Sequence, residues 1–138
     1  VAGDDTDGHV DDFARFVNET TVVCAFEEHE NDHNHKVLKK NYELLRKSTD
    51  QNGKVLAVVQ LPMPKLVKGR EGRLPASYAN FYIGNAAVVV PVFGDKNDAK
   101  ALDLLRGFFP DRKVVGIRSE KIVEGFGGLH CVTQQVPL

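Results

Sequence analysis

The sequence predicts an α/β fold made of repeated strand–strand–helix–strand (ββαβ) units. Two stretches of the chain show the same order of elements, each with a valine-rich run followed by one helical pattern. The chain has 138 residues, which is the size of one ordinary domain with a sizeable core. Because repeated units that each bury one face tend to stack around an axis, we expect the functional site where strand ends and loops converge.

The first predicted unit occupies residues 9–61. We expect a strand from about His9 after a glycine turn, and a second strand at Thr21–Phe26 because that run is rich in β-branched residues. Asn31 or Asp32 can cap a helix. Its apolar positions follow at helical spacing: Val37, Leu38, Tyr42, Leu44 and Leu45. An Asn-Gly turn then leads into a buried strand at 54–61.

The second predicted unit follows a long basic loop at 62–75, which contains three prolines. Strands are expected at 77–83, 86–93 and 113–117, with a helix before the third strand that Asp95 and Asp98 cap and that stops before Pro110. A further strand at 121–123 would lead into the C-terminal loop and could open a third unit.

An internal repeat relates the two units. Aligning 16–26 with 83–93 matches Asn18 with Asn85 and Phe26 with Phe93, and it sets Cys24 opposite Pro91. The identities are few, so the shared order of elements carries the interpretation.

The composition excludes several classes of protein. Lys plus Arg (18) nearly balances Asp plus Glu (19), so no global field attracts nucleic acid or an anionic membrane. No apolar run approaches the roughly 20 residues of a membrane span. No signal-peptide pattern is present, and two cysteines are too few for a disulfide framework. We therefore expect a cytoplasmic protein, and because the chain opens on Val1 we expect its natural N-terminus upstream.

A glycine-rich stretch with one cysteine lies near the end of the chain, at 125–135. Glycine leaves room for a ligand to approach closely, which makes Cys131 a candidate nucleophile. The alternative is an inert buried thiol, since free cysteine is among the most buried residue types.

His9 and Asp11 are the candidate partners of Cys131. If this segment is a strand, residues two apart share a face, so the two side chains should project together. They would supply a proton carrier and a fixed negative charge. His130 adjoins Cys131 and is the lesser candidate for the base role, because it would point to the other side of an extended backbone. Cys24 is expected to be a small buried side chain.

Two other polar segments have simpler interpretations. Residues 28–35 contain three histidines and three carboxylates, but we expect a solvated loop before a helix and no metal site. The basic loop, with Lys65, Lys68, Arg70 and Arg73, is interpreted as a solvated connection whose length also suits a lid.

Three motifs together resemble one family. They are TDGHVD at 6–11 with ARF at 14–16, LPASY at 74–78 with NF at 80–81, and GGLHCVTQQ at 127–135. In this order they are similar to the agmatine deiminases and the related bacterial (Porphyromonas-type) peptidylarginine deiminases. Phe126 departs from the Gly-Gly-Gly common before the cysteine in that family.

The resemblance implies a pentein fold, an α/β propeller of five ββαβ units around a central site. Residues 1–138 would form the C-terminal two to three units of a single catalytic domain whose N-terminal part lies outside this chain. The family's cysteine nucleophile falls on Cys131, its histidine acid/base on His9, and its guanidinium-binding aspartate on Asp11.

The resemblance further implies hydrolysis of agmatine to N-carbamoylputrescine and ammonia, as in putrescine biosynthesis, with peptidyl-arginine as the second candidate substrate. We expect a small cationic guanidinium compound as partner, no metal or organic cofactor, and leave a homo-oligomer open. Another Cys-His hydrolase or amidotransferase and a non-catalytic binding module remain alternatives.

Overall fold

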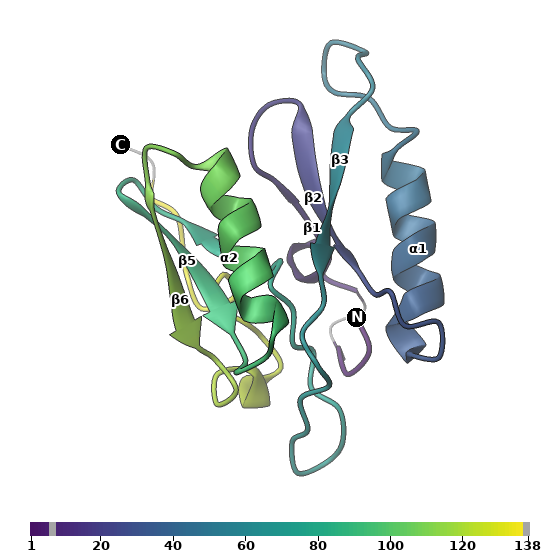
Figure 1. Cartoon of the computed structure of the whole chain (residues 1–138), viewed down its shortest axis with the longest axis vertical. Helices are drawn as coiled ribbons and strands as arrows, with labels where there is room; N and C mark the ends of the chain where they lie inside the picture. Colours follow the sequence, from purple (N-terminus) through teal and green to yellow (C-terminus); the bar gives the residue numbers. More distant parts are fainter. Residues whose placement is uncertain (6–7, 137–138) are drawn as a thin grey trace.

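A computed structural model describes residues 1–5 and 8–136, and it shows the order β–β–α–β twice (Figure 1). The first copy comprises β1 (Ala14–Phe16), β2 (Thr21–Phe26), α1 (His33–Leu45) and β3 (Ala57–Pro62). The second comprises β4 (Tyr82–Ile83), β5 (Ala87–Val92), α2 (Asn97–Phe108) and β6 (Lys113–Arg118). Two short 3-10 helices, η1 (Val10–Asp12) and η2 (Val123–Gly125), flank them. Thr6 and Asp7 of the first motif lie outside the described residues.

Each copy forms its own three-stranded mixed sheet. In the first, β1 pairs with β2 antiparallel and β2 pairs with β3 parallel; in the second, β4, β5 and β6 repeat this arrangement. Helix α1 covers the first sheet, whereas α2 contacts both β6 of its own unit and β3 of the other (Figure 1). The α/β class and the repeated order of elements are therefore confirmed.

The repeat contains a one-residue difference that the sequence alignment missed. Phe16 pairs with Val22 and Ile83 pairs with Val88, so the first hairpin connection is one residue longer than the second. Cys24 accordingly matches Val90 and not Pro91. A hairpin loop fixes the register of its strands, so one inserted residue shifts every later equivalence.

The local predictions succeeded where the pattern was strongest. Strands β2, β5 and β6 and both helices lie where we expected them, and Asp32 caps α1 by accepting a hydrogen bond from the Asn34 amide at 2.8 Å. Strand β3 begins only at Ala57 and is partly exposed, so the prediction of a buried strand at 54–61 was wrong in extent and burial.

Three predicted strands are absent or shortened. The segment at His9 forms η1, and the segment at 121–123 runs into η2. Of 77–83 only Tyr82 and Ile83 are strand, because the Asn80 and Phe81 carbonyls accept hydrogen bonds from the His130 amide and the Arg15 side chain and not from a neighbouring strand.

The main core lies between the two units. It joins side chains of the first sheet, such as Val23 and Leu61, to Val88, Val90 and Leu105 of the second unit. The irregular segment 77–81 is buried throughout, and Tyr78 and Phe81 are fully enclosed. This segment is therefore held from both sides and can position a polar residue accurately.

Polar contacts fix the buried segment as well. The Tyr78 hydroxyl donates to Asp98 Oδ1 at 2.7 Å, and the same carboxylate accepts the Phe93 amide at 3.1 Å. Burial and the Asp98 carboxylate raise the pKa of Tyr78 far above its usual value, so the hydroxyl stays a donor. Within residues 1–5 and 8–136, neither helix is long and apolar enough to cross a membrane.

The shared core predicts a contrast between two leucines. Leu105 on α2 is fully buried, whereas Leu44 on α1 is 55% exposed. Leu105→Ala should lower the free energy of unfolding by about 2–5 kcal/mol because it leaves a cavity, and Leu44→Ala should change it by less than about 0.5 kcal/mol. Denaturant titration of both variants measures this. Equal losses would show that α2 does not anchor the core.

Candidate active site

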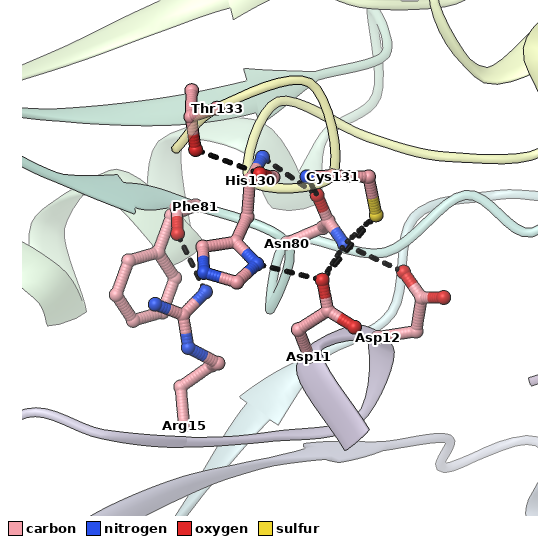
Figure 2. A network of polar contacts seen from close by, with 8 residues as sticks. All are labelled: Asp11, Asp12, Arg15, Asn80, Phe81, His130, Cys131 and Thr133. Atoms are coloured by element: carbon pink, nitrogen blue, oxygen red, sulfur yellow. Dashed lines mark hydrogen bonds and ion pairs between the residues drawn. The ribbon is translucent and has the colours of Figure 1, made fainter. Parts of the chain in front are cut away.

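Three segments that are distant in the sequence meet at one place (Figure 2). Asp11 and Asp12 come from η1, Asn80 comes from the buried segment before β4, and His130 with Cys131 comes from the C-terminal loop. All of these residues lie outside the two sheets, so the cluster forms where loops converge and not where strands end.

Asn80 is the centre of the cluster and is 1% exposed. Its Oδ1 accepts the backbone N–H of His130 at 2.8 Å and that of Cys131 at 3.3 Å. Because Oδ1 has these two donors, Nδ2 must face the other way, where it lies 3.1 Å from Asp11 Oδ2, 2.9 Å from Asp12 Oδ1 and 3.1 Å from Cys131 Sγ. One amide thus orients the loop and the acidic groups together.

Asp11 Oδ2 accepts contacts from both residues of the C-terminal loop. His130 Nδ1 lies 2.7 Å away and Cys131 Sγ lies 3.3 Å away. Burial raises the pKa of Asp11, but the hydrogen bonds from His130 and Cys131 outweigh it, so the net pKa is below the usual range. Asp11 is therefore a fixed negative charge beside the thiol.

The thiol itself is not activated in this arrangement. Burial raises the pKa of Cys131, and the Asp11 carboxylate raises it further, while the Gly128 backbone and Asn80 act in the opposite direction without compensating. Cys131 is nevertheless open to solvent. A thiolate here needs an additional positive charge close to Asp11.

Glycines let the loop approach Asn80. A Cβ on Gly128 would lie 2.5 Å from Asn80 Oδ1, and a Cβ on Gly127 would lie 2.9 Å from the Cβ of Cys131. The residue before them, Phe126, has a φ of +60°, the left-handed region that disfavours side chains. Phe126 therefore holds a conformation that glycine would adopt at less cost.

Arg15 adds a cation at the edge of the cluster. Its Nη1 donates to the Phe81 carbonyl at 2.7 Å, and its guanidinium lies 4.9 Å from the centre of the Phe81 ring. Burial lowers the pKa of Arg15, and its attraction to Asp11 and Cys131 opposes that shift. The geometry holds the backbone next to Asn80.

Two of the three predicted site residues are in contact in the structure, and the third does not join that contact. Asp11 and Cys131 touch, but His9 is exposed at the start of η1, so the predicted shared strand face of His9 and Asp11 was wrong. The imidazole in contact with Asp11 is that of His130, which we had expected to point away. The tight 3-10 turn replaces the alternation that a strand would have imposed.

Asn80 and Asp12 were not recognised as site residues from the sequence. Asn80 lies inside a quoted motif, and its only local signal is that it is a polar residue in an otherwise apolar buried stretch. Asp12 follows Asp11 in an acidic run that resembles a solvated turn, yet it is 3% exposed.

The remaining polar segments lie away from the cluster. His35 Nδ1 lies 2.7 Å from the Glu27 carbonyl, and Arg73 binds Asp32 at 2.8 Å, which ties the basic loop to the start of α1. Among residues 1–5 and 8–136, no group of three His, Cys, Asp or Glu side chains is arranged to hold a metal ion.

The chain is similar to known proteins along almost its whole length. A family model described as Porphyromonas-type peptidyl-arginine deiminase matches residues 1–137. A Latilactobacillus sakei protein provisionally named an agmatine deiminase is 38% identical over 152 aligned positions, which cover 97% of this chain and 42% of that protein.

Solved structures agree with this similarity. A Porphyromonas gingivalis protein provisionally named an arginine deiminase matches with a TM-score of 0.95 at 43% identity, over 99% of this chain and 40% of that one. An agmatine deiminase of Enterococcus faecalis, described as catalysing its reaction, matches with a TM-score of 0.88 at 38% identity, over 96% of this chain and 41% of that one. The chain spans about two-fifths of the length of these relatives.

The two cysteines should differ sharply in reactivity. Cys24 is fully buried, and burial raises its pKa to about 11, whereas Cys131 is open to solvent. A haloacetamidine, which combines an electrophile with a guanidinium-like cation, should label Cys131 and leave Cys24 unmodified in the folded protein. Mass spectrometry of the two tryptic peptides measures this, with denatured protein as the positive control for Cys24. Labelling of Cys24 alone would remove Cys131 as the candidate nucleophile.

Proposed function

Because this chain belongs to the Porphyromonas-type peptidyl-arginine deiminase family, we propose that it forms part of a catalytic domain that hydrolyses a guanidinium group. The carrying observation is the 3.3 Å contact between Cys131 Sγ and Asp11 Oδ2, which sets a candidate nucleophile beside a carboxylate able to bind a planar cation. Residues 1–138 would be the C-terminal part of one pentein-type propeller, and the remaining units would come from outside this chain.

Substrate binding and activation of the thiol are coupled in this proposal. A guanidinium bound to Asp11, together with a second carboxylate from outside this chain, competes with His130 and Cys131 for Asp11 Oδ2. The thiol then loses its anionic acceptor and gains a neighbouring cation. Both changes favour the thiolate, which is the nucleophilic form.

The reaction proceeds through a covalent intermediate. The Cys131 thiolate adds to the guanidinium carbon, an imidazolium protonates the departing nitrogen, and ammonia leaves an S-alkylthiouronium on the sulfur. The neutral imidazole then takes a proton from water, and the resulting hydroxide adds to the same carbon. The thiolate departs and the hydroxyl proton passes through solvent to the released ammonia, which leaves a ureido product and ammonium. Guanidinium plus water gives urea derivative plus ammonium, so no redox cofactor is needed.

We assign the acid/base role to His9, because the TDGHVD motif resembles that of the family and the resemblance implies this role for its histidine. The competing assignment is His130, which the 2.7 Å contact with Asp11 favours. An acyl-transfer hydrolase is less consistent with the site, because it needs donors for an oxyanion, whereas Asp11 offers an acceptor.

Agmatine is the proposed substrate, and N-carbamoylputrescine and ammonia are the products. The carboxylate of free arginine would call for a positioned arginine fork. Of the two candidates in the basic loop, Arg73 is engaged by Asp32 at 2.8 Å, and Arg70 lies exposed between glycines. The loop therefore favours a substrate without that carboxylate, and peptidyl-arginine is the second candidate.

Replacing each histidine separately tests the acid/base assignment. His9→Gln should lower kcat for ammonia release by about a hundredfold or more if His9 transfers protons, while His130→Gln should cause a smaller loss that appears mainly in KM through Asp11. Steady-state assays of the full-length protein measure both, and Cys131→Ala serves as the inactive control. A larger kcat loss in His130→Gln would move the role to His130.

A comparison of substrates tests the specificity. The kcat/KM for agmatine should exceed those for arginine and for a blocked arginine peptide, because the loop offers no fixed carboxylate fork. Arg70→Ala, with Lys68→Ala as the matched control, should leave the preference unchanged. If arginine is preferred and Arg70→Ala abolishes that preference, the substrate proposal is wrong while deimination stands.

A further inference from the structure

The Asn80 amide has fewer hydrogens than the acceptors around it require. Its Nδ2 carries two N–H groups, and three acceptors lie within hydrogen-bond distance: Asp12 Oδ1 at 2.9 Å, Asp11 Oδ2 at 3.1 Å and Cys131 Sγ at 3.1 Å. The amide cannot rotate to change this, because its Oδ1 is held by the backbone N–H groups of the C-terminal loop. At any moment one of the three acceptors lacks a hydrogen from Asn80.

Asp11 depends least on this amide. It already lies 2.7 Å from His130 Nδ1, whereas the Asp12 carboxylate accepts its hydrogen bond from Asn80. The competition is therefore chiefly between the Asp12 carboxylate and the Cys131 sulfur. An ionised acceptor holds a hydrogen bond roughly twice as strongly as a neutral one, so the charge of Asp12 decides the outcome.

Asp12 is in an environment where its charge is poorly tolerated. Burial and the neighbouring Asp11 raise its pKa to about 6, and Asp4 adds to the shift, while Asn80 and the amino group of Val1 oppose it. On the other side of Asn80, Cys131 faces Asp11, and Arg15 attracts its thiolate form. Asp12 therefore exchanges its proton near pH 6, whereas Asp11, whose pKa is lowered, stays ionised there.

We propose that Asp12 is a positioning residue that determines, through Asn80, whether an N–H group is available to the Cys131 sulfur. An ionised Asp12 holds one Asn80 hydrogen and leaves the other divided between Asp11 and the sulfur. A neutral Asp12 releases a hydrogen to the thiolate. The inference rests on the proposed role of Cys131 as nucleophile, but it concerns only the ionisation of that thiol.

Alkylation of Cys131 without substrate tests the proposal. The rate with iodoacetamide follows the thiolate fraction, so its pH profile reports the ionisation of the thiol. Asp12→Asn keeps the size of the side chain and removes the charge, and it should raise the rate at pH 7 by about threefold and move the profile to lower pH. The full-length protein is used, and the tryptic peptide that contains Cys131 is quantified by mass spectrometry. An unchanged profile, or one moved to higher pH, overturns the proposal.

A double-mutant cycle separates the hydrogen bond from the charge alone. In an Asn80→Ala background the effect of Asp12→Asn should disappear, because the amide that couples the two groups is gone. If the rate rises equally in both backgrounds, Asp12 acts through space and the role assigned to Asn80 is wrong. Asp12→Ala, which also frees the hydrogen, should shift the profile in the same direction and replaces Asp12→Asn if that variant does not fold.

Asp32→Asn is the matched control. Asp32 is also a hydrogen-bonded carboxylate, but it binds Arg73 and caps α1 and has no part in this cluster. Its loss should leave the Cys131 profile unchanged, and a shift as large as that of Asp12→Asn would indicate general loosening and overturn the proposal. Because the assay contains no guanidinium substrate, a shifted profile without deiminase activity refutes the proposed function alone, and activity without a shift refutes the role of Asp12 alone.

Discussion

The side chain of Asn80 is the constraint on which the site depends. It joins residues 69 positions before it to residues 51 positions after it, through Asp11 on one side and Cys131 on the other. Without it, the backbone N–H of Cys131 would lose its acceptor, and that of His130 would keep only the Asn80 carbonyl at 3.2 Å. The bare backbone of Gly128 is the counterpart of this contact, since any Cβ there would collide with the amide oxygen.

The accuracy of Asn80 comes from the packing of its own segment. Tyr78 and Phe81 flank it as fully buried rings. Asp98 on α2 accepts a hydrogen bond from the Tyr78 hydroxyl, and Arg15 on β1 donates one to the Phe81 carbonyl. Both repeat units therefore contribute to one polar side chain, which explains why an irregular segment lies deeper than most of the strands. Interiors are close-packed, so a displacement of either unit would reach the site.

Local sequence signals predicted the regular elements well, and they failed where distant contacts decide the conformation. The β-branched run at β2 and the cap at Asp32 act over a few residues, so both were placed correctly. Residues 77–81 have strand-like composition, but the Asn80 and Phe81 carbonyls bind groups 50 and 66 residues away, and no local pattern reports that. The one-residue difference between the hairpins likewise left the order of elements intact while shifting every alignment within the second strand.

The predictions of site residues also succeeded where residue type decided them and failed where they relied on an assumed local conformation. Cys131 and Asp11 were predicted because their types and glycine-rich or acidic settings are chemically suggestive, and the structure places them 3.3 Å apart. The expected pairing of His9 with Asp11 relied on strand geometry, and it was lost when the segment formed a 3-10 helix. Asp12 follows the predicted residue Asp11, and His130 precedes the predicted residue Cys131. Only the fold shows that both face the same cluster.

One electrostatic feature connects substrate choice with catalysis in the proposed function. Asp11 lies 3.3 Å from the Cys131 sulfur, and its carboxylate raises the pKa of Cys131 further than burial alone. An anionic or neutral ligand cannot relieve that unfavourable environment, whereas a planar cation neutralises Asp11 and stabilises the thiolate at once. Under the proposed function, the carboxylate that keeps the thiol protonated in the empty site also makes its activation depend on a guanidinium. Selectivity for a cation and protection of the thiol would then follow from the same charge.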